Sequence, residues 1–342
     1  MKKTVVKILK FLVFFSIGIF IFWLIYKDQD IERIKSVLKN EVVYLWVIVS
    51  LFIGLISHIS RTLRWELMIE AVSHKPKFAN TFMAVMIGYL MNLALPRMGE
   101  ISRCGVLSRY EKISFTKLLG TVVAERLVDM ISLLILLFIV IVSQFGQALR
   151  FLQQNPEIKE KITGITSSPI LVVVIIAFVV LAIIFRKRIK QSKVYKKLES
   201  IILNFKEGFI SIRSIKRKGW FWFHSVFIWF CYYMMLYVTF FAFDFTSHLN
   251  PISGLTTFVF ASFGMVAPVQ GGIGAWHFMA IEALSLYGVQ YENGVIFAFV
   301  AHTSMTLMII VLGIISMIAL SFINRREDVS ENKATETPVN IE

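Results

Sequence analysis

The stretch VIFAFVAHTSMTLMIIVLGIISMIALSF, residues 295–322, decides the fold class. It contains no Asp, Glu, Lys or Arg, and it is longer than the roughly 20 apolar residues that a helix needs to cross a bilayer. Comparable apolar runs precede it at 5–26, 42–57, 127–143, 170–185 and 220–243. Lipid tolerates only helices or closed barrels, and the alternating pattern of a barrel is absent. We therefore expect an all-α integral membrane protein with about six full transmembrane helices.

The charge distribution supports this interpretation and indicates the orientation. The net charge is +14, and the segment 186–218 holds twelve Lys and Arg against only Glu199 and Glu207. Such a segment is typical of a cytoplasmic linker lying on anionic headgroups. No nucleic-acid recognition fold surrounds these cations, so we expect no nucleic-acid partner. The two cysteines, Cys104 and Cys231, have no disulfide or metal spacing, and we expect no metal or cofactor.

Basic residues also flank both chain ends, which predicts that the N- and C-termini are cytoplasmic. With 186–218 on the same side, residues 79–95 begin and end in the cytoplasm, so they form a re-entrant segment; an ordinary span with an external basic loop is the alternative. A second interrupted segment at 251–287 occupies the corresponding place in the second half.

This order of segments predicts two inverted halves. We expect one domain over 1–325, with halves at about 1–145 and 168–322 and two re-entrant segments. Residues 326–342 are polar and are expected to form a disordered cytoplasmic tail.

The first candidate site lies in ALPRMGEISRCGVLSRYEKISFTKLLGTVVAERLVDM, residues 94–130. Pro96 and Gly99 break a helix, and Glu100 and Arg103 follow at i,i+3 spacing, where a salt bridge can form. Together with Arg97, the side chains of Glu100 and Arg103 are candidates for binding a charged headgroup.

The following apolar run carries Glu125 and Asp129 on one helix face, with Arg126 next to them. Ionisable groups in hydrocarbon are expensive and indicate function. We expect Arg97, Arg103 and Arg126 to neutralise a lipid phosphate. The structural alternative, in which the arginines only neutralise the carboxylates and lock the bundle, is compatible with this role.

The second candidate site lies in residues 260–288, FASFGMVAPVQGGIGAWHFMAIEALSLYG. Gly271, Gly272 and Gly274 predict an irregular loop whose free amides open a helix and can bind an anion. His277 and His302 lie near it in the sequence. The alternatives are that the glycines serve helix packing and the histidines are interior hydrogen-bonded residues.

Three motifs in order, LPRMGEISR at 95–103, ERLVD at 125–129 and PVQGGIG at 268–274, resemble the transmembrane domain of lysylphosphatidylglycerol synthases, a family of flippase-like proteins. The resemblance implies a bacterial or archaeal inner-membrane protein with paired re-entrant segments that moves anionic or isoprenoid lipids between leaflets. Many members carry Glu and Arg where this chain has His277 and His302. That departure leaves the substrate open, and a histidine pair predicts pH sensitivity near neutrality.

We therefore expect a lipid transporter that binds a phospholipid or isoprenoid-phosphate lipid in the bacterial inner membrane, alone, as a homodimer or with a lipid-pathway partner. Catalysis is not expected, because the sequence lacks metalloprotease, nucleotide-hydrolysis and serine-nucleophile motifs, and only about 20 polar residues follow Phe322, too few for an aminoacyl-transfer domain. The alternatives are a non-catalytic accessory subunit of a lipid or glycan pathway and an intramembrane lipid-modifying enzyme.

Overall fold

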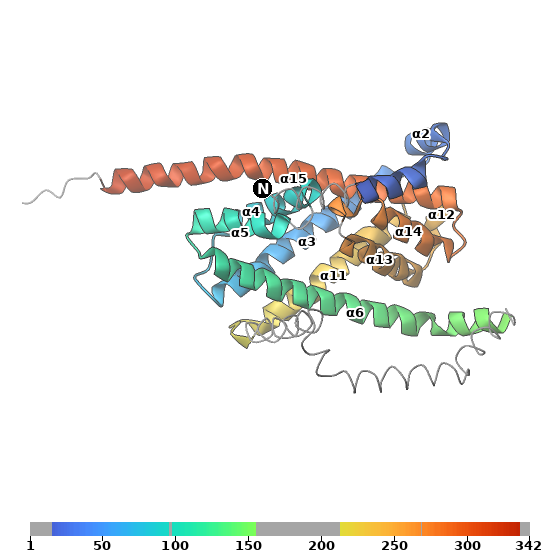
Figure 1. Ribbon diagram of the computed structural model, residues 1–342, viewed down its shortest axis with the longest axis horizontal. Coiled ribbons are helices and arrows are strands. Elements are labelled where there is room, and N and C mark those ends of the chain that lie inside the picture. Colours follow the sequence, from blue (N-terminus) through green and yellow to red (C-terminus); the bar gives the residue numbers. More distant parts are fainter. Residues whose placement is uncertain (1–15, 96–97, 155–212, 268, 336–342) are drawn as a thin grey trace, which may run out of the picture.

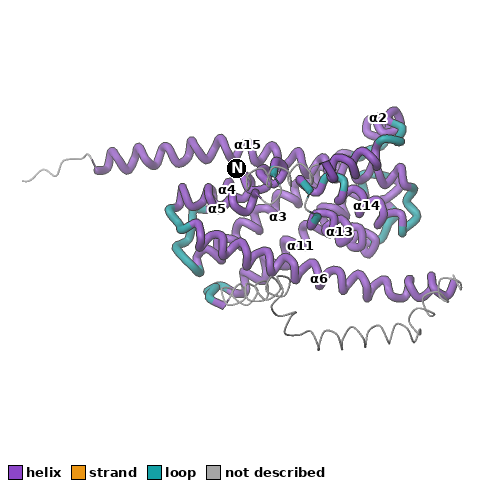
Figure 2. The backbone as a smooth tube through the Cα atoms, in the orientation of Figure 1, coloured by secondary structure: helices purple, strands orange, loops and turns teal. Residues whose placement is uncertain are grey.

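The computed structural model describes residues 16–95, 98–154, 213–267 and 269–335 (Figure 1). Within these ranges every regular element is a helix, as Figure 2 shows, and no strand occurs. The predicted all-α membrane architecture is confirmed.

Four described helices are long and apolar enough to cross a membrane. They are α3 (Tyr44–Glu70), α6 (Phe115–Gln154), α11 (Lys218–Phe240) and α15 (Tyr291–Thr335). They cover four of the six predicted crossings. Of the other two, 5–26 is described only as the helix Ser16–Tyr26, and 170–185 lies outside the described residues, as do nearly all of the basic linker and the end of the predicted tail.

The lipid-facing character of these helices is visible in their exposed side chains. On α6, five large apolar residues in the middle of the span are about half exposed: Leu134, Ile135, Phe138, Ile141 and Val142. Water would oppose such exposure over a whole helix face, whereas hydrocarbon does not. The buried face of the same helix carries Glu125 and Asp129, so α6 is polar inside and apolar outside.

The predicted segment 79–95 does not turn back within itself: it is one helix, α4 (Phe78–Ala94), and the chain reverses only after it, so that α5 (Met98–Glu111) forms the second limb of a helical hairpin. The two limbs approach closely where two glycines face each other: a Cβ atom on Gly99 would collide with the carbonyl oxygen of Gly88. The Gly99 amide donates to Asn92 Oδ1 (2.7 Å), which fixes the start of α5 against α4.

The second half contains a matching hairpin of α13 (Pro251–Val266), the short η1 (Gln270–Gly272) and α14 (Ala275–Ser285). Asn250 caps α13 by accepting from the Ser253 amide (2.9 Å). A glycine again allows close approach, because a Cβ atom on Gly264 would lie 2.7 Å from the Ala275 carbonyl oxygen. Gly271, Gly272 and Gly274 all have positive φ, which explains why glycines occupy this turn.

The two hairpins lie toward opposite ends of the long axis in Figure 1, and α3 packs against α11 between them. Their tips meet at the contact of η1 with α4, where Gly271 faces Leu93. The second predicted segment, 251–287, therefore contains a complete hairpin, whereas the first, 79–95, supplies only one limb of its hairpin. Their depth in the bilayer, the domain bounds and the inverted relation of the halves stay predictions.

Two short helices, α2 (Ile31–Asn40) and α12 (Asp244–Ser247), lie at the same end of the molecule as α14 (Figure 1). Asp30 caps α2 by accepting from the amides of Glu32 and Arg33. Arg33 then pairs with Glu292 (2.8 Å) and ties α2 to the start of α15.

Candidate functional site

A buried network of charged side chains joins α3 to α6. Arg61 Nη1 lies 3.1 Å from Asp129 Oδ2 and also contacts Glu125, while Arg64 Nη2 lies 2.8 Å from Asp129 Oδ1 and 3.2 Å from Glu125 Oε1. Glu125 and Arg64 have no exposed side-chain surface. Because Glu125 and Asp129 are one turn apart, each can meet both arginines. This network fastens two spanning helices deep in the bundle.

The first hairpin joins the network through Arg103 of α5. Its Nη2 donates to Glu125 Oε2 (2.8 Å), and its guanidinium lies over the ring of Trp65, 4.6 Å from the ring centre. Trp65 is itself held by a hydrogen bond from Nε1 to Thr121 Oγ1 (2.9 Å). Glu125 therefore receives three arginines from two different helices, an arrangement that needs a fully charged carboxylate.

The network reaches the surface at Arg126. Its Nη2 lies 2.8 Å from Glu100 Oε1, and its Nη1 lies 3.8 Å from Asp129 Oδ2. The side chains of Arg126 and Glu100 are 44% and 23% exposed, unlike the enclosed Arg61 and Arg64. The outer pair is thus the least enclosed part of the network.

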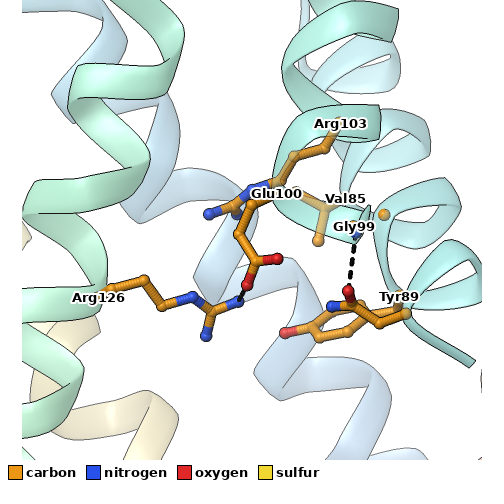
Figure 3. Close-up of a pocket in the computed structure, with 8 residues that line it drawn as sticks. Val85, Tyr89, Gly99, Glu100, Arg103 and Arg126 are labelled. Carbon is orange, nitrogen blue, oxygen red and sulfur yellow. Dashed lines mark hydrogen bonds and ion pairs between the residues drawn. The ribbon is translucent and has the colours of Figure 1, made fainter. Parts of the chain in front are cut away.

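A pocket opens beside the outer pair, between α4, α5 and α6 (Figure 3). It is lined by Val85, Gly88, Tyr89, Asn92, Gly99, Glu100, Arg103 and Arg126. The empty space of the pocket is about 220 Å³, and this volume includes the open side. A larger group would enter only if Glu100 and Arg126 moved apart.

Two polar atoms at the pocket have no partner within the described part of the chain. They are Arg103 Nε and Glu100 Oε2, and both are buried. Arg103 keeps only 4% of its surface exposed. Buried donors are normally satisfied, so the free Nε marks a place where an acceptor would be stabilised.

A chain of aromatic polar groups extends from the network toward α11. Arg61 Nε donates to Tyr232 Oη (3.2 Å), and Tyr232 Oη lies 3.2 Å from Tyr89 Oη. His58 packs on Tyr89 with ring centres 4.9 Å apart, and neither of its ring nitrogens has a described partner. The pocket-lining Tyr89 is therefore connected to the buried ions through one hydroxyl.

The second candidate site is built around the glycine turn between α13 and α14. His302 Nε2 donates to the Gly271 carbonyl (2.8 Å), which requires that its Nδ1 accept from Thr306 Oγ1 (3.3 Å) if the ring is neutral. His277 Nδ1 accepts from the Gly274 amide (3.4 Å), and the two rings are 4.5 Å apart. The histidines contact each other and hold the turn in shape.

The structure brings five predicted residues into one network: Glu100, Arg103, Glu125, Arg126 and Asp129. The expected pairing of Glu100 with Arg103 is wrong, because Arg103 extends inward to Glu125 and leaves Glu100 to Arg126. Gly271, Gly272, Gly274, His277 and His302 form a separate group, and none of them lines the pocket. Arg97 lies outside the described residues.

Sequence reasoning missed Arg61, Arg64, His58 and Tyr89. The apolar run at 42–57 predicts a complete span, whereas α3 continues without a break to Glu70. One signal for their presence was available, because Arg61 and Arg64 stand at i,i+3 directly after this apolar run and share one face of its helical continuation, but their partners could not be read from the sequence.

Comparison with known proteins places this site in a family. The sequence pattern described as the lysylphosphatidylglycerol synthase TM region matches residues 7–313. The chain belongs to this family. The match includes both hairpins and every member of the buried network, and it confirms the resemblance carried by the three motifs.

One similar curated protein is the UPF0104 membrane protein MJ1595 of Methanocaldococcus jannaschii, 28% identical over 131 residues. The aligned part is 37% of this chain and 36% of that protein, so the two are related over about a third of their lengths. No solved structure matches the chain. The family assignment and the apolar helices together establish a multi-pass membrane protein.

Proposed function

We propose that this protein moves a phosphate-bearing lipid, anionic or isoprenoid, between the leaflets of a bacterial inner membrane without catalysing a reaction. The headgroup passes the pocket between α4, α5 and α6 while the acyl or prenyl tails stay in the bilayer. The single observation that carries the proposal is the outer pair: Arg126 and Glu100 connect a buried charge network to a pocket in a membrane-embedded bundle.

The buried part of the network places a positively charged group, the guanidinium of Arg103, in a fixed position at the pocket. Arg103 is held by Glu125 and by Trp65, so its guanidinium is positioned before a ligand arrives. Preorganised donors cost little on binding, and guanidinium groups bind phosphate in a planar, two-pronged geometry. Arg126 lies across the pocket from Arg103 and supplies a second cation that can exchange partners.

We propose that contact between the two hairpin tips closes the route of the headgroup through the bundle. Leu93 of α4 lies against Gly271 of the opposite turn, and the adjacent Asn92 lines the pocket. Movement of the tips therefore changes the pocket directly. Hairpins from two halves that meet near the middle of a bundle are the arrangement in which one site can face either side of the membrane in turn.

A non-catalytic accessory subunit is the second candidate function. The observation in its favour is the enclosure of Glu125, whose carboxylate is surrounded by three arginines and has no exposed surface. If the protein is an accessory subunit, the whole network serves only to hold α3, α5 and α6 together. The outer pair distinguishes the two functions, because a fastening gains nothing from an exposed arginine beside a pocket.

The test is translocation of a fluorescent phospholipid in vesicles reconstituted with purified protein. Arg103→Gln and Arg126→Gln are each expected to slow translocation by at least about tenfold, the effect of losing one charge-assisted contact. Arg217→Gln is the matched control, because Arg217 forms a similar interhelix pair with Glu70 (2.9 Å) away from the pocket. Equal rates for all four proteins would remove the support for transport.

A further inference from the structure

We propose that His277 makes the glycine turn of the second hairpin sensitive to pH. In its neutral form His277 holds the turn closed, and its protonation releases the turn, whereas the neighbouring His302 keeps its own contact with the turn in either form. This inference goes beyond lipid transport and does not depend on it, because the order of the turn can be measured without a lipid.

The glycine turn is the part of the second hairpin that contacts two other helices. A Cβ atom on Gly271 would lie 2.6 Å from Leu93 Cδ2 at the end of α4, and one on Gly274 would lie 2.6 Å from the Gly18 carbonyl oxygen. Gly271 and Gly274 have positive φ, and glycine passes readily between this conformation and others. Both contacts therefore depend on the hydrogen bonds that hold the turn in its observed conformation.

His277 supplies one of these hydrogen bonds through an unprotonated nitrogen. It is the third residue of α14, and its Nδ1 accepts from the amide of the preceding cap residue, Gly274, at 3.4 Å. A side chain at this position that accepts from the cap amide forms half of a capping box, in which Glu or Gln is the usual residue. Because a backbone N–H can only donate, Nδ1 must keep its lone pair, and the bond exists only while the ring is neutral.

His302 holds the same turn in a way that protonation does not disturb. Its Nε2 donates to the Gly271 carbonyl (2.8 Å), so this nitrogen carries a proton already. Its Nδ1 lies 3.3 Å from Thr306 Oγ1, and a hydroxyl group can turn either to donate or to accept. A second proton on His302 therefore breaks no hydrogen bond, whereas a proton on Nδ1 of His277 places two donors against each other.

The surroundings of the two rings offer a protonated His277 no other acceptor. The rings of His277 and His302 are buried with their centres 4.5 Å apart, Phe22 and Tyr26 lie edge-on to His277, and Trp276 packs on His302. Among the described residues, the titratable groups against either ring are Tyr26 and the other histidine, and no carboxylate is paired with them. A proton on His277 is therefore accommodated only when the turn opens, so acid favours the open turn below about pH 6.5, where a solvated imidazole becomes charged.

Amide hydrogen exchange of the whole purified protein tests this inference. Exchange rates are divided by those of unstructured peptides at each pH, which gives the protection due to structure. Between about pH 7.5 and about pH 5.5, the protection of residues 269–274 in the wild type is expected to fall by about tenfold. Protection of residues 100–107 in α5, which contain no histidine, is the internal control and should stay the same.

Two matched variants identify the histidine that responds. His277→Gln places at the third helical position a side chain that can accept from the Gly274 amide at every pH, so it should keep the protection seen at neutral pH and lose the pH dependence. His302→Gln retains a donor for the Gly271 carbonyl and should keep the pH dependence.

Three results would overturn the inference: protection of 269–274 that does not change with pH in the wild type, pH dependence that persists in His277→Gln, or pH dependence that is lost in His302→Gln. None of these results bears on the proposed function, which the lipid translocation assay tests separately. A protein that moves no lipid would still show the expected change in exchange.

Discussion

Arg126 Nη2 lies 2.8 Å from Glu100 Oε1 at the mouth of a pocket, while the residue before Arg126 in the chain, Glu125, is completely enclosed by arginines. Two adjacent residues of one helix therefore face different environments. Glu125 stabilises the bundle, whereas Arg126 remains available for exchange. The predictions below separate these two roles.

Glu125→Gln is expected to destabilise the protein strongly. The substitution leaves three guanidinium groups around a neutral amide, and breaking a buried pair in this way costs about 3–5 kcal/mol. Equilibrium unfolding in mixed detergent measures the loss. Glu70→Gln, at a partly exposed pair, should cost less than about 1 kcal/mol, and equal losses for the two variants would contradict the account.

Gly99→Ala is expected to open the first hairpin, because its Cβ atom would collide with the Gly88 carbonyl and with Asn92. Forcing a methyl group into such a contact costs about 1–3 kcal/mol. Gly105→Ala provides a control on the same helix, since nothing lies within 4 Å of the added atom. That control should be neutral or slightly stabilising, by up to about 1 kcal/mol, because Ala is the better helix former. Both are read as shifts of the thermal unfolding midpoint.

His302→Ala is expected to loosen the glycine turn of the second hairpin. The substitution removes the donor to the Gly271 carbonyl and the ring that packs on His277. Amide hydrogen exchange over 269–274 should then become faster by about tenfold, corresponding to roughly 1.4 kcal/mol of local stability. The exposed His248 gives a control, His248→Ala, that should not change exchange in this segment. Unchanged exchange in His302→Ala would show that the histidines do not hold the turn.

Single cysteines test the predicted orientation. Lys75→Cys precedes α4, and Asp244→Cys begins α12 after the outward end of α11. The basic segments place the first in the cytoplasm and the second outside. A membrane-impermeant maleimide applied to intact cells should label only Asp244→Cys. The native cysteines, Cys104 and Cys231, are buried and should stay unlabelled. Labelling of Lys75→Cys alone would invert the topology.

The sequence was sufficient for the fold class because a membrane span is a local signal: an apolar run of sufficient length defines it without knowledge of its neighbours. The hairpins were also predictable, because Pro96 and the glycines of 271–274 interrupt helices at fixed places. The sequence predicts only that Gly99 helps to break a helix. The structure shows that Gly99 also lets α5 approach α4 closely. Most of the architecture that could be predicted therefore follows from local properties of the chain: the length of apolar runs and the positions of Pro and Gly.

The pairing of charges was not predictable, because it depends on which helices lie side by side. Glu100 and Arg103 stand one turn apart, yet Arg103 reaches Glu125 on another helix. Arg61 and Arg64 were overlooked for the same reason, since their partners lie more than 60 positions away in the chain. Separation of the glycine turn from the pocket likewise follows from packing alone.

The most direct test of the central claim is lipid translocation by the double variant Arg126→Gln/Glu100→Gln. Removing both partners leaves neither charge of the pair orphaned, so the fold should be nearly unaffected. The double variant Arg217→Gln/Glu70→Gln is the control at the distant pair. If the outer pair handles the headgroup, phosphatidylglycerol translocation should fall by at least about tenfold in the first variant and stay at the wild-type rate in the second. Equal translocation rates in both double variants and the wild type would contradict a role of the outer pair in transport. The network would then serve only to hold the helices together.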